Sequence, residues 1–316
     1  MDLILEKYFN FKKIELFSKS DVNLHAVLID SKLNKSNKKC VLYIHGFIDY
    51  FFHPHVAQEF HKNEFDFFAL DLRRYGRSLL AHQKPNYCSN IEEYFEEITA
   101  AINIIKQSCT KIYLLGHSTG GLIGSCYMNT GELKNSIAGL ILNSPFFDLA
   151  QPKFFTKLLY YIVKPLAFIF PNGNVSNGLS AIYASSLHKD YNGEWDFNLD
   201  WKPIQGYPIY FKWFVAIVDA QRSLRKSDIQ VPVLLLHSKK SFLLKKNSDE
   251  VKVSDTVLNI EDMKNIGSVL GDDVTIIAIE NALHDVFLSA RTVRETAFLE
   301  MFNWLEKKTC SALTFK

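Results

Sequence analysis

The sequence predicts an α/β protein in which a mostly parallel central sheet carries helices on both faces. Short apolar runs typical of buried strands alternate with longer stretches whose apolar residues recur at helical spacing. Polar or glycine residues end several of these runs, as at His45-Gly46 and Ser118. Strands that alternate with helices form parallel sheets, and the carboxyl ends of such strands hold the active site.

The first half of the chain supplies an antiparallel start and then the first parallel strands. Alternating bulky residues predict a hairpin built from residues 13–19 and 23–29. The strands expected to be buried on both faces are residues 40–44, 65–70, 111–115 and 137–143. The helices expected around them are residues 56–63, 91–108 and 122–128, the second capped by Ser89 or Asn90.

At Phe146 the alternation stops, and an aromatic-rich stretch with helical spacing begins. We predict that residues 146–228 form a helical cap, or lid, inserted into a core made of residues 1–145 and 229–316. The helices expected in this insertion are residues 154–170, 181–187 and 209–224. The core then resumes with strands at residues 231–237 and 274–279 and a closing helix at residues 292–307.

Composition narrows the function. The 316 residues carry a formal net charge of +2, which gives no electrostatic case for nucleic acid. The five cysteines form no CxxC pair, and the N-terminus does not read as a signal peptide, so we expect a reduced, cytoplasmic setting. The apolar stretch at residues 158–170 is too short to span a bilayer. We see no metal cluster and no phosphate-binding glycine loop, and we predict no cofactor.

The stretch around Ser118 is the strongest functional signal. Gly116-x-Ser118-x-Gly120 lies between a strand and a helix, the pattern of a nucleophile elbow. The serine there needs a strained backbone, and both glycines pass close to neighbouring backbone. An ordinary glycine-rich turn is the alternative interpretation.

A serine hydroxyl is a weak nucleophile and needs an adjacent base. Three histidines follow Ser118 at a distance, namely His188, His237 and His284. His188 lies in the insertion, and His237 ends a strand, where a packed histidine is expected. His284 lies between the last strand and the last helix, and we predict that it is the base.

With these residues the chain resembles the α/β-hydrolase family, and within it the serine hydrolases similar to monoacylglycerol lipases, lysophospholipases and the serine aminopeptidase S33 group. The matching pieces are His45-Gly46-Phe47, Asp71-x-Arg73-x-x-Gly76-x-Ser78, Gly116-His117-Ser118-Thr119-Gly120-Gly121 and His284. Their order and rough spacing match as well, over nearly the whole chain except the insertion.

The resemblance implies an α/β-hydrolase fold, with Ser118 as nucleophile and His284 as general base and then acid. It places the oxyanion hole at the backbone N–H groups of Phe47 and Thr119, which are fixed before charge develops. His45, Asp71 and Arg73 are expected to fix loops. The family often has glycine where this chain has Arg74.

The catalytic acid departs from the family's pattern. The family places it shortly after the strand that ends here at His237, where this chain has Ser238-Lys239-Lys240-Ser241. The downstream candidates are Asp249, Glu250, Asp255, Glu261 and Asp262. Residues 254–259 resemble the family's loop at this point, displaced by the lysine-rich stretch before it. Asp255 also precedes His284 by 29 residues (284 − 255), close to the usual separation, and we predict that it is the acid.

These residues predict hydrolysis of a carboxylic ester with an apolar acyl group, through an acyl-enzyme. The expected substrate is a small ester or a lipid, as for a carboxylesterase, monoacylglycerol lipase or lysophospholipase. Tyr50, Phe51 and Phe146 are predicted to contact it, and the aromatic cap could touch a membrane surface transiently. The sequence leaves the acyl chain, the alcohol and the oligomeric state open.

Two other functions stay in view. A serine aminopeptidase would need a carboxylate in the insertion to hold the substrate ammonium, and the candidates are Asp148, Glu194, Asp196 and Asp200. A catalytically inactive hydrolase fold used for binding is the second alternative, favoured by the absence of an acid at its usual place.

Overall fold

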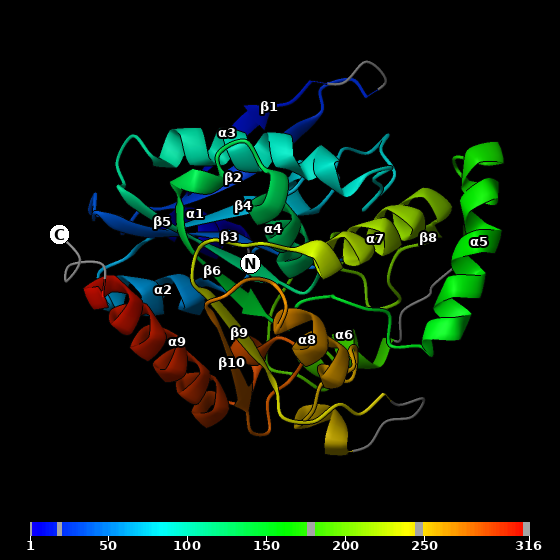
Figure 1. Cartoon of the computed structure of the whole chain (residues 1–316). Helices are drawn as coiled ribbons and strands as arrows, with labels where there is room; N and C mark the ends of the chain where they lie inside the picture. Colours follow the sequence, from blue (N-terminus) through cyan, green and yellow to red (C-terminus); the bar gives the residue numbers. More distant parts are fainter. Residues whose placement is uncertain (1, 18–20, 176–180, 244–248, 312–316) are drawn as a thin grey trace.

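A central eight-stranded sheet organises the computed structural model, which describes all residues except 1, 18–20, 176–180, 244–248 and 312–316. The strands lie in the order β1 (Phe9–Glu15), β2 (His25–Ser31), β4 (Asp66–Asp71), β3 (Lys39–Ile44), β5 (Lys111–His117), β6 (Ile137–Asn143), β9 (Val233–Ser238) and β10 (Val274–Ile279). Only the β1–β2 and β2–β4 pairs are antiparallel, and the rest of the sheet is parallel (Figure 1). The predicted α/β class is confirmed.

Helices cover both faces of this sheet, because successive strand residues point to opposite sides. Leu42 and Ile44 of β3 join one core cluster, whereas Val41 and Tyr43 join the other. The helices on the first face are α3 (Phe95–Ile105), α4 (Thr119–Thr130), α7 (Phe211–Ser223) and α8 (Ile260–Gly267). Those on the second face are α1 (Asp2–Tyr8), α2 (Pro54–Lys62) and α9 (Arg291–Ser311).

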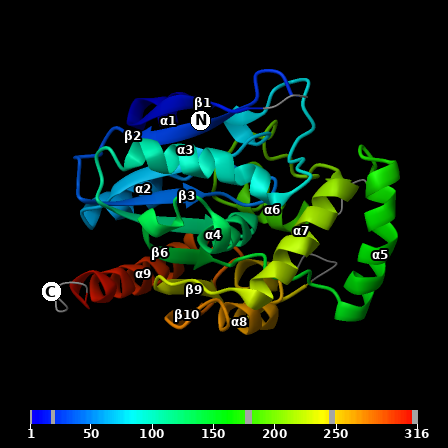
Figure 2. The ribbon, with the colours of Figure 1, turned by 45° about the horizontal axis from the view of Figure 1, so that its top comes forward.

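Between β6 and β9 the chain leaves the sheet. This segment contains α5 (Lys153–Ile169), β7 (Asn174–Val175), α6 (Ala181–Leu187), β8 (Ile209–Tyr210) and α7. Helix α5 packs against α7 through Tyr160, Val163 and Ala167, its buried residues, and lies on the outside of the molecule (Figure 2). Helix α6 packs beside the loops that follow β3 and β10, in a third apolar cluster with Tyr50 and Leu288.

The starting hairpin forms, but its first strand begins and ends four residues earlier than predicted. β1 follows directly on α1, a helix that the sequence reading did not predict, and pairs with β2 in the register Phe9 to Ser31. The end of the predicted strand, residues 18–19, lies outside the described residues. The predicted helix at 91–108 begins with a 3₁₀ turn that the Asn90 side chain caps by accepting the Glu92 N–H at 3.1 Å.

Among the described residues, none of the helices is both long and apolar enough to cross a bilayer.

Candidate active site

Ser118 stands between β5 and α4 in a backbone conformation that few residues other than glycine adopt, with φ +51° and ψ −115°. The close approach of the chain around it explains the two flanking glycines. A Cβ on Gly116 would lie 2.5 Å from the Gly120 carbonyl oxygen, and one on Gly120 would lie 2.3 Å from the Ile44 oxygen. The elbow therefore holds the serine at the carboxyl edge of the sheet, between the ends of neighbouring parallel strands.

Three predicted side chains form one chain of hydrogen bonds. His284 Nδ1 lies 2.8 Å from Asp255 Oδ2, and His284 Nε2 lies 3.0 Å from Ser118 Oγ. A carboxylate only accepts, so Nδ1 carries the proton, and Nε2 is free to accept the serine hydroxyl. The serine is 8% exposed and the histidine 2%.

The Asp255 carboxylate is fixed on both of its oxygens. Oδ1 accepts the N–H groups of Val257 and Leu258, each at 2.8 Å, while Oδ2 faces His284. The backbone of Asp255 pairs with that of Ser241 in an isolated bridge. The chain at Asp255 therefore lies next to the chain at Ser241, the residue that occupies the acid's usual place.

The other acid candidates lie elsewhere. Asp249 is exposed in a 3₁₀ turn, and Glu250 is in the same turn. Glu261 pairs with Lys264 on α8. Burial raises the pKa of Asp262, with Asp148 as its next cause, so this carboxyl group faces the segment after β6.

The two predicted oxyanion amides belong to the loop after β3 and to the first residue of α4. In that loop, the Gly46 N–H donates to Asp49 Oδ2 at 3.3 Å and the Ile48 N–H donates to Asn86 Oδ1 at 3.0 Å. No hydrogen bond joins the Phe47 N–H to another described residue. Thr119 opens α4, where helix geometry leaves N–H groups without intrahelical partners.

The residues expected to fix loops make such contacts. His45 is fully buried, its Nε2 accepts the Leu72 N–H at 3.0 Å, and burial lowers its pKa. Asp71 accepts the N–H groups of Phe51 and Arg77. Arg74 takes φ +64°, the left-handed conformation for which glycine is favoured, and its side chain pairs with Asp21.

The predicted substrate contacts differ in where their rings lie. Phe146 is partly buried and stacks on Trp213, and its N–H donates to the Ser118 carbonyl oxygen at 2.9 Å. The Phe51 ring packs in the core against Phe9 and Phe67 and makes no contact with Ser118. Tyr50 is fully buried too, and its hydroxyl accepts the Asn198 N–H.

Sequence reasoning missed a second polar group of residues beside the site. Lys202, from the segment after β6, donates to Asp49 Oδ1 at 2.8 Å, and both side chains are buried. The Tyr183 ring of α6 meets the His284 ring edge-on at 5.5 Å, and its hydroxyl accepts the Asp285 N–H. These contacts join residues about 100 or more positions apart, so no local sequence pattern predicts them.

The described part of the chain contains no group of three or more His, Cys, Asp or Glu side chains placed to hold a metal ion.

The chain is similar to known proteins over most of its length. The model of the family described as serine aminopeptidase, S33, matches residues 35–289. No curated protein matches the chain.

Solved structures with a similar fold include three that cover almost all of it. A soluble variant of monoglyceride lipase from Saccharomyces cerevisiae, in complex with a substrate analog, has TM-score 0.68 at 19% identity, over 95% of this chain and 96% of that one. Monoacylglycerol lipase from Paleococcus ferrophilus has TM-score 0.65 at 20% identity, over 95% and 99%. A thermostable carboxyl esterase from Bacillus coagulans, in complex with glycerol, has TM-score 0.66 at 13% identity, over 95% and 98%.

Proposed function

The chain belongs to the serine aminopeptidase S33 family of α/β-hydrolases, and on that premise we propose that it is a serine hydrolase that cleaves carboxylic esters with an apolar acyl group. One observation carries the proposal: a serine in a strained elbow is joined through His284 to a fixed, buried carboxylate. The likeness to lipases and an esterase supports the choice of esters.

The proposed reaction runs through an acyl-enzyme. His284 Nε2 takes the Ser118 proton as Oγ attacks the ester carbonyl, and Asp255 stabilises the imidazolium that forms. The N–H groups of Phe47 and Thr119 stabilise the negative charge on the carbonyl oxygen. The imidazolium then gives its proton to the departing alcohol. Water, activated by the same histidine, releases the acid and restores the serine.

We propose residues 146–228 as a cap over this site. Two contacts support that role, because Tyr183 packs on His284 and Trp213 packs on Phe47 with ring centroids 4.1 Å apart. The Trp213 ring lies beside those of both Phe47 and Phe146, and the Phe146 N–H donates a hydrogen bond to the carbonyl oxygen of Ser118. An apolar acyl chain is the substrate part that such aromatic walls favour.

The acidic residues of the cap argue for esters over aminoacyl substrates. An aminopeptidase needs a free carboxylate to hold an ammonium group. Here Glu194 pairs with Arg294, Asp196 with Lys189, and Asp148 with Arg225 at 3.7 Å. Three of the four candidates are thus matched by a cation already.

We also propose that the cap contacts a membrane surface, because α5 presents an unusual number of exposed apolar side chains. Phe154 is 73% exposed and Phe168 84% exposed. A helix with such side chains among lysines is typical of elements that lie in the membrane interface.

Labelling by a fluorophosphonate probe tests the proposed nucleophile. We expect Ser118 to be labelled, and Ser118→Ala to lower ester turnover by on the order of a million-fold. Ser125→Ala, on the helix α4 that follows Ser118, is the matched control and should keep activity, since its hydroxyl donates to the Gly121 carbonyl oxygen.

A substrate panel tests the chemistry. Esters of graded acyl length should be cleaved faster than aminoacyl amides. Faster cleavage of the amides would favour the aminopeptidase, and an unlabelled Ser118 would favour an inactive binding protein.

A further inference from the structure

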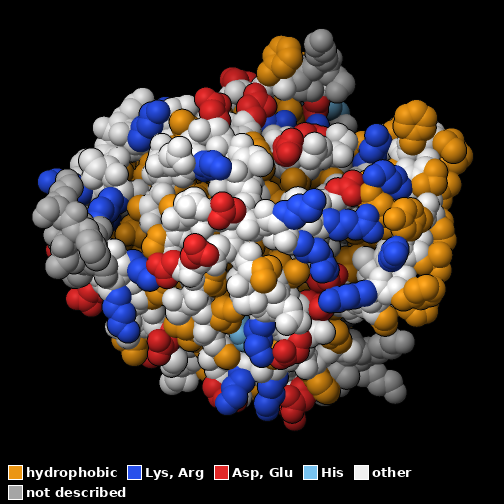
Figure 3. All heavy atoms as spheres, viewed as in Figure 1, with side chains coloured by type: hydrophobic (Ala, Val, Ile, Leu, Met, Phe, Trp, Pro, Cys, Tyr) orange, Lys and Arg blue, Asp and Glu red, His pale blue; other side chains and the backbone are white. Residues whose placement is uncertain are grey.

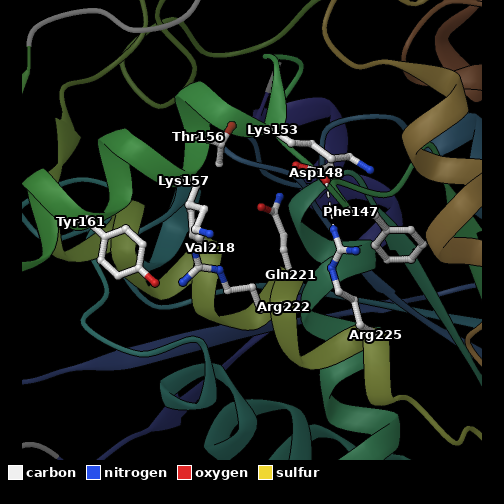
Figure 4. Close-up of a pocket in the computed structure, with 10 residues that line it drawn as sticks. All are labelled: Phe147, Asp148, Lys153, Thr156, Lys157, Tyr161, Val218, Gln221, Arg222 and Arg225. Carbon is white, nitrogen blue, oxygen red and sulfur yellow. Dashed lines mark ion pairs between the residues drawn. The ribbon is translucent and has the colours of Figure 1, made fainter.

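A cavity of about 320 Å³ lies between α5 and α7, and four of the ten residues that line it are lysines or arginines (Figure 4). Lys153 and Lys157 come from the first turns of α5, Arg222 from the end of α7 and Arg225 from the turn after it. Asp148 is the one acidic side chain among the described residues that line it. Four cations and one carboxylate leave a formal charge of +3 (4 − 1).

Among the described residues, nearby carboxylates balance only part of this charge, and Asp262 interacts electrostatically with Lys153 and Arg225. Arg225 lies 3.7 Å from Asp148. Within the described ranges, Lys153, Lys157 and Arg222 form no ion pair, and the Arg222 guanidinium lies instead over the Tyr160 ring at 3.8 Å. Like charges held together repel one another, so a bound anion would relieve that repulsion.

The lysine and arginine side chains supply the hydrogen-bond donors of the cavity. Their nitrogens are a donor set that suits phosphate oxygens, since arginine offers a planar fork and lysine a compact charge. A phosphomonoester carries roughly −1.5 to −2 charges at pH 7 and matches the cavity's charge better than a carboxylate does.

The residues around the cavity indicate which kind of molecule would carry such a phosphate. Apolar side chains cover the outer surface of α5, and Figure 3 shows them next to the cluster of basic side chains. The exposed members are Phe154, Phe155, Leu158, Leu159, Tyr161, Ile162, Phe168, Ile169 and Phe170. Lysines are depleted from the cores of protein–protein interfaces, whereas apolar side chains mixed with lysine and arginine are typical of helices that lie in a lipid surface.

We propose that this cavity binds the phosphate group of an anionic membrane lipid, preferably a phosphomonoester, while the exposed apolar side chains of α5 enter the same membrane. The inference rests on the proposed membrane contact and specifies which lipid head group the contact selects. It does not depend on the chemistry at Ser118.

Vesicle co-sedimentation of the full chain tests the proposal. The vesicles contain phosphatidylcholine alone, or with phosphatidylglycerol or phosphatidic acid in amounts that give equal zeta potentials. We expect the protein to bind phosphatidic acid vesicles about ten-fold more tightly than phosphatidylglycerol vesicles, because the monoester makes more charge-assisted hydrogen bonds. Hydrolysis of a soluble short-chain ester, measured on the same samples, reports separately on the proposed function.

A charge-neutralised pair of variants assigns the effect to the cavity. Lys153→Gln/Lys157→Gln should weaken binding to phosphatidic acid vesicles by roughly 30-fold, at about 1 kcal/mol for each charge, and should abolish the preference for the monoester. Lys12→Gln/Lys106→Gln, on β1 and at the end of α3, is the matched control and should change binding by less than about two-fold. All four lysines are exposed, so folding and soluble-ester hydrolysis should be unchanged.

Several results would overturn the proposal. Equal binding to the phosphatidylglycerol and phosphatidic acid vesicles would mean that membrane binding rests on non-specific charge attraction. Equal binding to phosphatidylcholine vesicles would mean that it rests on the apolar side chains alone. Binding of inorganic phosphate without binding to any vesicle would mean that the cavity serves a free anion. A dimer that hides α5 from vesicles would mean that a second copy covers this face. Absent soluble-ester hydrolysis alongside lipid binding would instead count against the proposed function alone.

Discussion

At the scale of single residues, the orientation of the Asp255 carboxylate decides, in the proposed mechanism, whether His284 can accept a proton from Ser118. Its Oδ1 already holds two backbone N–H groups, so only Oδ2 is available to the imidazole. In Asp255→Asn the carbonyl oxygen keeps the backbone bonds, and the NH₂ group then faces Nδ1. The imidazole takes the opposite tautomer, with its proton on Nε2, and can no longer act as the base. We expect turnover to fall by roughly ten-thousand-fold.

Ester turnover of purified variants with matched melting temperatures measures this effect. Asp249→Asn, which changes an exposed acid in the same part of the chain, is the control and should keep near-full activity. The opposite ranking of these two variants would place the acid at residue 249.

The residues of the site differ in how far the sequence reveals them. Ser118 can be found from Gly116 and Gly120 because the backbone strain and the close approach of the chain are local. Both require glycines at fixed positions next to the serine, which gives a recognisable sequence pattern. Asp255 is harder to place, since the detour before it breaks the usual spacing. Lys202 and Asp49 lie 153 positions apart, and their pairing follows from the packing of one segment on another.

At the scale of elements, the buried ion pair of Lys202 and Asp49 ties the proposed cap to the loop that carries Phe47. Asp49 also accepts the Gly46 N–H, so the same carboxylate holds both segments. Lys202→Met leaves this carboxylate buried without its cation, and we expect a loss of about 3–5 kcal/mol in the free energy of unfolding. Urea denaturation measures the loss.

Two further variants separate lost charge from lost packing. Asp49→Asn/Lys202→Met removes both charges while an amide oxygen remains for Gly46, so it should recover most of the stability. Lys189→Met breaks an exposed pair with Asp196 and should cost less than about 1 kcal/mol. Equal losses in the two lysine variants would contradict a special role for the buried pair.

At the scale of the whole molecule, buried histidines make stability depend on pH. His53 is 1% exposed, and burial lowers its pKa to about 4. In the unfolded chain its pKa is about 6.5, so between these values the unfolded state binds more protons, and stability falls as the pH falls. From pH 7 to pH 5 this one residue should cost about 2 kcal/mol in the free energy of unfolding.

Urea titrations at the two pH values check the sign and the size. His53→Asn should lose that part of the pH dependence, whatever its effect on stability at pH 7. A slope unchanged by His53→Asn would mean that other groups carry the acid sensitivity.

The overall architecture could be predicted because the apolar runs of β3, β4, β5, β6 and β9 are continuous, as burial on both faces demands. The edge of the sheet was less predictable. β1 is mostly exposed, and its alternation continues past its end, so the sequence alone places it four residues too late. Helix α1 is short and leaves little periodicity to detect.

The bridge between Ser241 and Asp255 fixes Asp255 next to the end of the segment that follows β9. The Asp255 N–H donates to the Lys240 carbonyl oxygen at 2.8 Å, and the Phe242 N–H donates to the Asp255 backbone carbonyl oxygen at 2.7 Å. These two backbone hydrogen bonds form a clamp that closes the loop at its base. Because this clamp fixes the backbone of Asp255, we expect residues inserted into the loop to leave the position of the carboxylate unchanged. We therefore expect this loop to accept a peptide tag or a small sensor domain without a change in the orientation of the Asp255 carboxylate.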